Sequence, residues 1–479
     1  MIELPVLNHQ FDEERAGFPE PARAAPKQRS VGEYAMAAII GLGLLAFVLC
    51  GLWGWGRGSW WALLLSFGLP AVATAGFFIT RYRGTVPGIK HNDTRFRDVQ
   101  SRGITAWMIA VFLTGFYIVL YWYADLQARG LPAVFEGPIR LLDPLAMALT
   151  GEQADHWFLY GTLYTLAILT FGVRMFLKYR HNRYQIIRNA SVMFFQLGLA
   201  FILPGILRRL HQPEYYVTYF WPLKPEYAWP GGTHSIIENA SGFLGWIMIG
   251  FGLFAILVLT PLLTYFYGKR WYCSWVCGCG GLAETLGDPW RQLSDKSPRA
   301  WKIERVLIYS VLIFIILVTG LLWFDNMTRG EILGGASLAA RKWYGFLVVG
   351  MFAGVIGVGF YPLMGSRVWC RFGCPMAAIL GILQRTFSRF RITTNGDQCM
   401  SCGNCSTYCE MGIDVRAYAQ RGENIVRASC VGCGICAAVC PRGVLKLENG
   451  MTHHDRYDNE AGNPLAQVIA DIRNGTDAH

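Results

Sequence analysis

The sequence is poor in charged side chains. Asp, Glu, Lys and Arg make up 16% of its 479 residues, whereas soluble domains average about 25%. Hydrophobic residues reach 53% and aromatic residues 14%, a composition typical of an integral membrane protein with aromatic side chains at its interfaces. The net charge of +11 does not favour nucleic acid as a partner, because the Lys and Arg residues cluster in short connections beside apolar stretches.

Several cofactor signatures are also missing. No Gly-x-Gly-x-x-Gly opens a helix after a strand and no Walker A motif occurs, so we expect neither NAD nor a nucleotide to bind. A b-type haem commonly needs axial histidines, and none of the nine histidines lies deep in an apolar stretch. Residues 1–33 lack the apolar core of a secretory signal, and we interpret them as a flexible cytoplasmic arm.

Eight stretches are long and apolar enough to cross a bilayer as helices of about 20 residues. They cover approximately residues 34–55, 60–80, 104–125, 157–177, 190–207, 242–267, 305–324 and 344–364. The fifth is short, because Pro204 and Gly205 interrupt it. The pattern predicts an all-α polytopic membrane bundle of about eight transmembrane helices. Five spans form an N-terminal membrane domain at 34–240, and the others belong to hairpins at 241–375.

The distribution of basic residues predicts the orientation of the bundle. Residues 1–33, 81–103, 178–189 and 268–304, all on one side, hold 20 Lys and Arg, whereas 56–59, 126–156, 208–241 and 325–343 hold 9. The more basic side faces the cytoplasm. We therefore expect a multi-pass protein of the bacterial plasma (inner) membrane, with both termini in the cytoplasm.

Two runs of four cysteines near the C-terminus are the most specific feature of the chain. Their x2-x2-x3 spacing is that of a two-cluster bacterial ferredoxin, in which the fourth cysteine of each run ligates the other [4Fe–4S] cluster. A zinc site usually takes four ligands from two separated pairs and does not need two matching runs. We predict an α+β two-cluster ferredoxin-like domain at 392–450. Its first cluster would bind Cys399, Cys402, Cys405 and Cys440, and its second Cys430, Cys433, Cys436 and Cys409.

One residue of the first run departs from the usual pattern. Glu410 follows Cys409, where such runs usually carry proline, as Pro441 follows Cys440 in the second run. The change removes no ligand, and we expect it to alter the surroundings of one cluster.

A second cysteine motif is duplicated where the sixth and eighth spans end. Residues 268–277 and 365–374 both read Gly-x-Arg-x-aromatic-Cys-x-aromatic-x-Cys. Thiols four residues apart on a helix share one face, and a nearby arginine favours thiolate. The four sulfurs are therefore candidates for a third iron or other metal centre, or for a redox-active thiol site. The alternative is that they fill small gaps in the core. The residues concerned are Cys273, Cys277, Cys370 and Cys374, with Arg270 and Arg367.

Other segments have weaker signals. Residues 376–391 are amphipathic and basic, which predicts an interfacial helix that joins the bundle to the ferredoxin domain, and 451–479 form a polar tail. The aromatic loop 208–241 is a candidate quinone site, but an interfacial belt or a partner-docking surface is the favoured interpretation. That loop lies on the side away from the clusters, so a quinone site near the cytoplasmic ends of spans six and eight is simpler. Cys279 has no assigned role, and we expect Cys50 to be a packing residue.

The combination of spans, paired membrane motifs and a double-cluster module resembles the NosR/NapH-type membrane polyferredoxins over roughly residues 240–450. The resemblance implies electron transfer between the quinone pool and respiratory reductases. A related oxidase-assembly polyferredoxin reduces copper. Gly278 replaces the proline of the first membrane motif. Neither the flavin-bearing domain of the NosR kind nor the C-terminal domain of the copper-reductase kind is recognisable, so the subfamily stays open.

These observations predict an iron–sulfur electron-transfer protein that connects the quinone pool with a redox partner in a respiratory chain. It would act as the electron-transfer subunit of a quinol-linked oxidoreductase, embedded in the lipid bilayer as part of a membrane complex. Two alternatives remain open: a copper reductase or assembly factor for a respiratory enzyme, and a non-catalytic wiring subunit of a larger complex.

Overall fold

The computed structural model describes residues 30–82, 101, 103–130, 136–333, 335–395 and 398–449. Within these ranges eight helical spans are long and apolar enough to cross a membrane. They are Val31–Gly51, Trp60–Tyr82, Gly103–Tyr121, His156–Lys178, Arg183–Arg209, Leu244–Tyr267, Pro298–Met327 and Ala336–Ile356. Each coincides with a predicted stretch, so the predicted all-α bundle is confirmed. The polar tail at 451–479, and the predicted arm up to residue 29, lie outside the described residues.

Four spans contain a π-helical segment, whose turns are wider than those of an α-helix. These spans are α3–η1–α4 (Trp60–Leu63, Leu64–Gly68, Leu69–Tyr82), α11–η3–α12 (Arg183–Phe194, Phe195–Ile202, Leu203–Arg209), α14–η5–α15 (Leu244–Phe254, Ala255–Leu259, Thr260–Tyr267) and α19–η7 (Ala336–Tyr344, Gly345–Ile356). Pro70, Pro204 and Pro261 each lie within two residues of the end of such a segment. Proline lacks an N–H donor and collides with the carbonyl of the preceding turn, and a local π adjustment accommodates it. The fifth span therefore continues through Pro204, and its predicted interruption is wrong.

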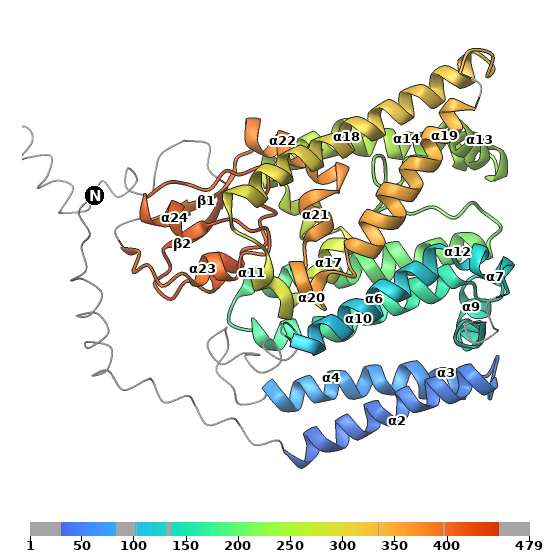
Figure 1. The fold of residues 1–479 in the computed structure, drawn as a ribbon, viewed down its shortest axis with the longest axis horizontal. Coiled ribbons are helices and arrows are strands. Elements are labelled where there is room, and N and C mark those ends of the chain that lie inside the picture. Colours follow the sequence, from blue (N-terminus) through green and yellow to red (C-terminus); the bar gives the residue numbers. More distant parts are fainter. Residues whose placement is uncertain are drawn as a thin grey trace, which may run out of the picture.

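The long helices pack side by side with the hairpin of α2 (Val31–Trp53) and α4 at one edge (Figure 1). Next to this hairpin is α10 (His156–Lys178), and α6 (Gly103–Tyr121) packs against η7. The opposite edge is formed by α18 (Pro298–Met327) with α19. Short helices connect the spans: α7 (Tyr123–Ala128), α8 (Glu136–Arg140), α9 (Asp143–Leu149), η4 (Pro225–Ala228) and α13 (Pro230–Asn239).

Two groups of short helices bring the duplicated cysteine motif into the bundle. The first group lies between α15 and α18 and consists of α16 (Arg270–Cys273), α17 (Gly278–Glu284) and η6 (Asp288–Leu293). The second follows η7 and consists of α20 (Tyr361–Met364), α21 (Val368–Phe372) and α22 (Pro375–Phe387). Figure 1 shows α17, α20 and α21 among the long helices, and most residues of these three short helices are buried.

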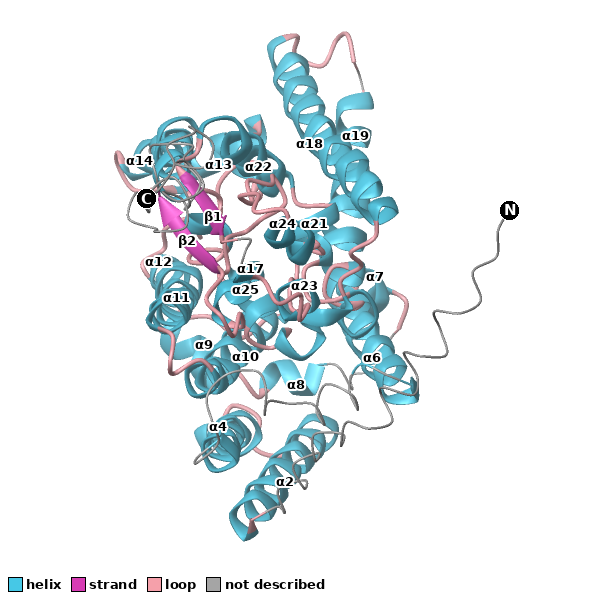
Figure 2. Cartoon of the chain, turned by 90° about the vertical axis from the view of Figure 1, so that its left-hand side faces the viewer, coloured by secondary structure: helices cyan, strands magenta, loops and turns pink. Residues whose placement is uncertain are grey.

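A small α+β module lies at one end of the bundle, at the left in Figure 1, and Figure 2 looks onto its sheet. Strands β1 (Phe390–Thr394) and β2 (Leu445–Asn449) pair antiparallel, from Phe390 opposite Asn449 to Thr394 opposite Leu445. Three short helices complete the module: α23 (Asn404–Thr407), α24 (Val415–Gln420) and α25 (Ile435–Ala438).

The segment that joins bundle and module differs from its prediction. The helix predicted at 376–391 ends at Phe387, because Phe390 and Arg391 belong to β1, whose backbone pairs with β2. One face of α22 packs against α15 and α18 and buries Met376, Ala377 and Leu380. The connection is therefore a packed helix of the bundle that leads directly into the sheet.

Candidate iron–sulfur sites

The eight cysteines of the two runs line two separate cavities. The outer cavity is lined by Cys399, Cys402, Cys405 and Cys440, with Met400, Arg416 and Arg442 among its other residues. The inner cavity is lined by Cys409, Cys430, Cys433 and Cys436, together with apolar side chains that include Ile392 and Val431. Each cavity therefore combines three cysteines of one run with the last cysteine of the other, which is the arrangement that the spacing predicts.

Glycines allow the backbone to wrap around these cavities. Gly403 precedes α23 at φ 74° and Gly434 precedes α25 at φ 73°. Residues other than glycine, Asn and Asp rarely adopt this left-handed backbone conformation, and glycine adopts it most readily. The x2-x2-x3 spacing thus works together with one glycine in each run to turn three sulfurs toward one cavity.

The sulfur arrangement fits a multi-iron cluster better than a single metal ion. Among the described residues, no three cysteine sulfurs lie within 4.8 Å of one another. A tetrahedral zinc ion with Zn–S bonds of about 2.3 Å would hold its sulfurs about 3.8 Å apart. Burial raises the pKa of the Cys430 thiol to about 11 and that of Cys433 to about 12. These thiols therefore stay protonated at neutral pH unless a bound metal displaces their protons.

The two cavities differ in their surroundings. At the outer cavity Cys402 is exposed, and the side chain of Met400 is 57% exposed. At the inner cavity Cys430 and Cys436 are buried, and membrane helices cover the loop that carries them. One cavity thus faces outward and the other faces the bundle.

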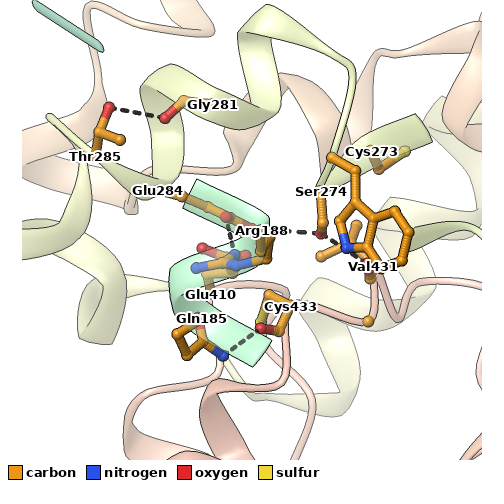
Figure 3. Close-up of polar contacts among 12 residues, drawn as sticks. Gln185, Arg188, Cys273, Ser274, Gly281, Glu284, Thr285, Glu410, Val431 and Cys433 are labelled. Carbon is orange, nitrogen blue, oxygen red and sulfur yellow. Dashed lines mark hydrogen bonds and ion pairs between the residues drawn. The ribbon is translucent and has the colours of Figure 1, made fainter. Parts of the chain in front are cut away.

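Side chains of the bundle bind the backbone of the inner-cavity loop. The Gln384 amide donates to the carbonyls of Arg427 and Cys430, both at 2.8 Å, and Gln185 donates to the Cys433 carbonyl at 2.8 Å. The Ser274 hydroxyl donates to the Val431 carbonyl at 2.8 Å (Figure 3). The Tyr184 hydroxyl donates to the Gly432 carbonyl, again at 2.8 Å. Each buried carbonyl is satisfied by a side chain from another part of the chain, so the module is docked in one orientation.

Five buried charged side chains meet between this loop and the membrane motif. Figure 3 shows three of them, Arg188, Glu284 and Glu410. Glu410 forms ion pairs with Arg291 at 2.8 Å and with Arg367 at 3.0 Å. Glu284 pairs with Arg188 and, at 2.5 Å, with Arg367. We call this group the buried charge cluster. Burial alone would raise the pKa of the Glu410 carboxyl, but Arg291 and Arg367 outweigh burial and hold the pKa below its usual value.

Three side chains in this region lie as close together as metal ligands do, but they do not form a metal site. Oxygens of Glu284 and Glu410 and the sulfur of Cys433 lie within 4.8 Å of one another. Arg188, Arg291 and Arg367 neutralise the two carboxylates, and Cys433 lines the inner cavity. The carboxylates are therefore partners of arginine and not free ligands.

The four membrane-motif cysteines are all buried, and the two motifs come together. The Arg367 guanidinium donates to the carbonyl of Cys273 at 3.2 Å and lies 3.6 Å from the Cys370 sulfur. Cys273, Cys277 and Cys374 belong to one core cluster of buried side chains. The structure thus brings Cys273, Cys277, Cys370 and Cys374 into one buried region.

Two expectations about this motif are wrong. The paired thiols do not share a helix face: Cys273 ends α16 and Cys277 precedes α17, while Cys370 lies in α21 and Cys374 precedes α22. The two arginines also differ. Arg367 contacts a sulfur, whereas the Arg270 guanidinium lies 4.3 Å from the Phe390 ring and donates to Asn449, so Arg270 anchors the sheet instead.

The residues around Gly278 explain the missing proline of the first motif. A Cβ atom on Gly278 would lie 2.5 Å from both Gln196 Oε1 and the Tyr219 hydroxyl. Tyr219 belongs to the aromatic loop 208–241, so part of this loop reaches the cysteine motif instead of staying at the far side as expected. Tyr272 also donates to the Thr218 carbonyl at 2.6 Å.

The remaining two cysteines have different surroundings. The Cys279 thiol is a hydrogen-bond partner of Cys277 and lowers the pKa of that thiol, whereas burial raises the pKa of Cys273, Cys370 and Cys374. Cys50 packs in an apolar cluster with residues such as Ile139 and Leu142, in agreement with its expected packing role.

Comparisons with known proteins agree with the cavities. A 4Fe-4S dicluster domain matches residues 398–445, and a 4Fe-4S binding domain matches residues 249–303 and 345–394. The cysteines, the cavities and these domains define a 4Fe–4S protein with a membrane bundle. No solved structure gives a significant match.

The curated relatives are more specific. YccM of Escherichia coli (strain K12) is 26% identical over 170 residues, which cover 34% of this chain and 46% of YccM. The ferredoxin-type protein MauN of methylamine utilisation from Paracoccus denitrificans is 28% identical over 195 residues, or 39% of this chain and 64% of MauN. The ferredoxin-type protein NapH of E. coli is 26% identical over 155 residues, or 32% of this chain and 51% of NapH.

The chain therefore spans about half to two thirds of the length of these relatives. Together with a match to NosR, they confirm the resemblance stated from the sequence. The chain is a homologue of the NosR/NapH-type membrane polyferredoxins.

Replacing Gln384 by leucine tests how the inner-cavity loop is held. The variant leaves the carbonyls of Arg427 and Cys430 without their side-chain donor, at a cost of about 1–3 kcal/mol for each buried group left unsatisfied. We expect the protein to lose iron from one site faster on incubation with a chelator. Gln153→Leu is the matched control, because Gln153 accepts a hydrogen bond from Arg140 at an exposed position and lines neither cavity. Equal iron loss from both variants would contradict the docking described above.

Proposed function

We propose that this chain transfers single electrons between a redox partner and the membrane quinone pool, and that two [4Fe–4S] clusters carry them. The observation that carries the proposal is the pair of cavities, each lined by three cysteines of one run and the last cysteine of the other. A cluster in such a site accepts and releases one electron at a time, with a potential set by its surroundings. Cys399, Cys402, Cys405 and Cys440 would hold one cluster, and Cys430, Cys433, Cys436 and Cys409 the other.

The difference between the two cavities gives the transfer a spatial order. The exposed Cys402 and Met400 make the outer cavity accessible to a protein partner. Gln185 and Gln384 of the bundle donate hydrogen bonds to the loop that lines the inner cavity. The partner would therefore dock beside Met400, while the bundle covers the inner site. The excess of basic residues in the connections on the same side supports a cytoplasmic location for the module.

We further propose a third metal centre at Cys273, Cys277, Cys370 and Cys374. The matched 4Fe-4S binding domain covers both membrane motifs. All four sulfurs are buried, and Arg367 supplies a positive charge beside Cys370. A tetrahedral zinc ion held by these four sulfurs would need them closer together than they are, which favours an iron cluster over zinc.

The region around Gly278 supports the quinone pool as the membrane-side partner. A quinone headgroup needs aromatic or apolar walls and one or two polar partners. Tyr164 and Tyr219 lie next to Gly278, and the buried Gln196 Oε1 there has no hydrogen-bond partner. These groups adjoin Cys277, so a reduced headgroup nearby would be close to the proposed third centre.

Iron analysis tests the cluster content. We expect about twelve irons per chain with matching acid-labile sulfide, and about eight in a variant with all four membrane-motif cysteines changed to serine. Cys402→Ser and Cys436→Ser should each remove a different EPR signal. Cys50→Ser is the control, because Cys50 lies in an apolar cluster away from both motifs. Eight irons in the unmodified chain would refute the third centre, and zinc without sulfide would refute the clusters.

Reduction by a quinol tests the membrane-side partner. In lipid nanodiscs under anaerobic conditions, a quinol analogue should raise the cluster EPR signals, because Gly278 and its neighbours adjoin the membrane cysteines. Gln196→Leu should slow this reduction without slowing reduction by dithionite. Signals that appear only with dithionite would show that electrons enter from a donor other than quinol.

A further inference from the structure

Glu410 occupies the position that follows the last cysteine of the first run, where the second run has Pro441. Its side chain is completely buried and points away from the module toward the bundle, where it meets Arg291 and Arg367. Both contacts join buried opposite charges at 3.0 Å or less, so the attraction is chiefly Coulombic. Proline could make no such contact, and the substitution therefore adds a charged link between module and bundle.

Arg367 is the other end of this link. One guanidinium nitrogen is 3.0 Å from a Glu410 oxygen, and the other is 3.6 Å from the Cys370 sulfur. Glu410 follows Cys409, which lines the inner cavity, and Arg367 contacts Cys370 of the membrane motif. The side chains of Glu410 and Arg367 therefore connect the two cysteine sites. The first arginine of the duplicated motif, Arg270, makes no equivalent contact, because it is held by Phe390 and Asn449.

We propose that Glu410 and Arg367 are positioning residues that set the reduction potential of the inner site jointly with that of the membrane cysteines. The inference rests on the proposed function, since it assumes that both sites carry redox centres. It makes the two potentials interdependent: any change at one end of the Glu410–Arg367 pair changes the field at both sites.

The charges in this region are well placed to have such an effect. A thiolate-bound cluster becomes more negative when it is reduced, so nearby positive charge raises its potential and nearby negative charge lowers it. Water and salt screen exposed charges strongly but screen buried charges little. Glu410, Arg291 and Arg367 are all nearly inaccessible to solvent. The charged residues that line the outer cavity, Arg416 and Arg442, are exposed instead.

The test is a redox titration of the full chain followed by EPR. Glu410→Gln removes one of the two carboxylates beside each of Arg291 and Arg367, while Asp288 and Glu284 remain. The added net positive charge should raise the potential of the inner site. We expect at least a tenfold rise in the ratio of reduced to oxidised centre at a fixed potential, or about 59 mV for one electron. Arg367→Gln should lower the potentials of both the inner site and the membrane centre. Because the residues act as a pair, the shifts should not add in the double variant.

Two controls accompany these variants. Glu423→Gln removes the same charge from the same module at an exposed position, and it should leave all potentials nearly unchanged. The outer site of each variant is an internal control. Equal shifts at the outer and inner sites, or shifts no larger than those of Glu423→Gln, would overturn the inference. So would strictly additive shifts in the double variant.

Failure to assemble is also informative. If Glu410→Gln loses the inner site, Glu410→Asp, which keeps the charge, should retain it with a potential close to that of the unmodified chain. Loss of iron from both variants would assign Glu410 a purely structural role and overturn the inference. If the unmodified chain shows no signal from a second cluster, the proposed function itself fails, and the two failures are thereby distinguishable.

Discussion

The structure depends on the burial of arginine between the ferredoxin module and the bundle. Arg188, Arg291 and Arg367 are removed from water, and an unpaired buried charge is strongly destabilising. Glu284 from the bundle and Glu410 from the module neutralise them in part. Module and bundle therefore each supply a carboxylate that the arginines need. A buried ion-pair group of this kind adds little net stability over apolar packing, but it requires one relative placement of the two parts.

That placement connects the two kinds of cysteine site. Hydrogen bonds from Gln185, Tyr184, Ser274 and Gln384 orient the loop that carries Cys430 and Cys433. Arg367 meanwhile reaches the cysteines of the membrane motif. The duplicated motif has diverged in this respect: its first arginine holds the sheet of the module, and its second holds the buried charge cluster. Arg270 in the first copy of the motif contacts the sheet of the module, and Arg367 in the second copy forms an ion pair with Glu410 of the module.

Much of this architecture follows from sequence patterns that reflect local physics. Apolar runs predicted all eight spans, because a helix in lipid needs apolar side chains along its whole length. Cysteine spacing predicted which sulfurs share each cavity. The continuation of span five through Pro204 was missed, because a π-helical turn has no sequence signal of its own. The assumption that Cys273 and Cys277 share a helix failed, because the chain turns between them.

Long-range pairings were the least predictable features. Nothing in the sequence pairs Glu410 with Arg291 or Arg367, although the absence of proline at 410 marked the position as unusual. Likewise, Gly278 marked a departure whose reason, the approach of Gln196 and Tyr219, appears only in three dimensions. In both cases a departure from a familiar motif located a tertiary contact without identifying its partner.

The central claim is that the inner-cavity loop belongs to a rigid junction with the bundle, while the outer loop is free to meet a partner. Hydrogen–deuterium exchange on the full chain in nanodiscs tests it directly. The account predicts that amides of the inner-cavity loop, residues 427–434, exchange much more slowly than those of the outer loop, residues 399–405. The reason is that side chains of the bundle cover the inner-cavity loop and not the outer loop. Equally fast exchange in both loops would contradict it, because the module would then move independently of the bundle.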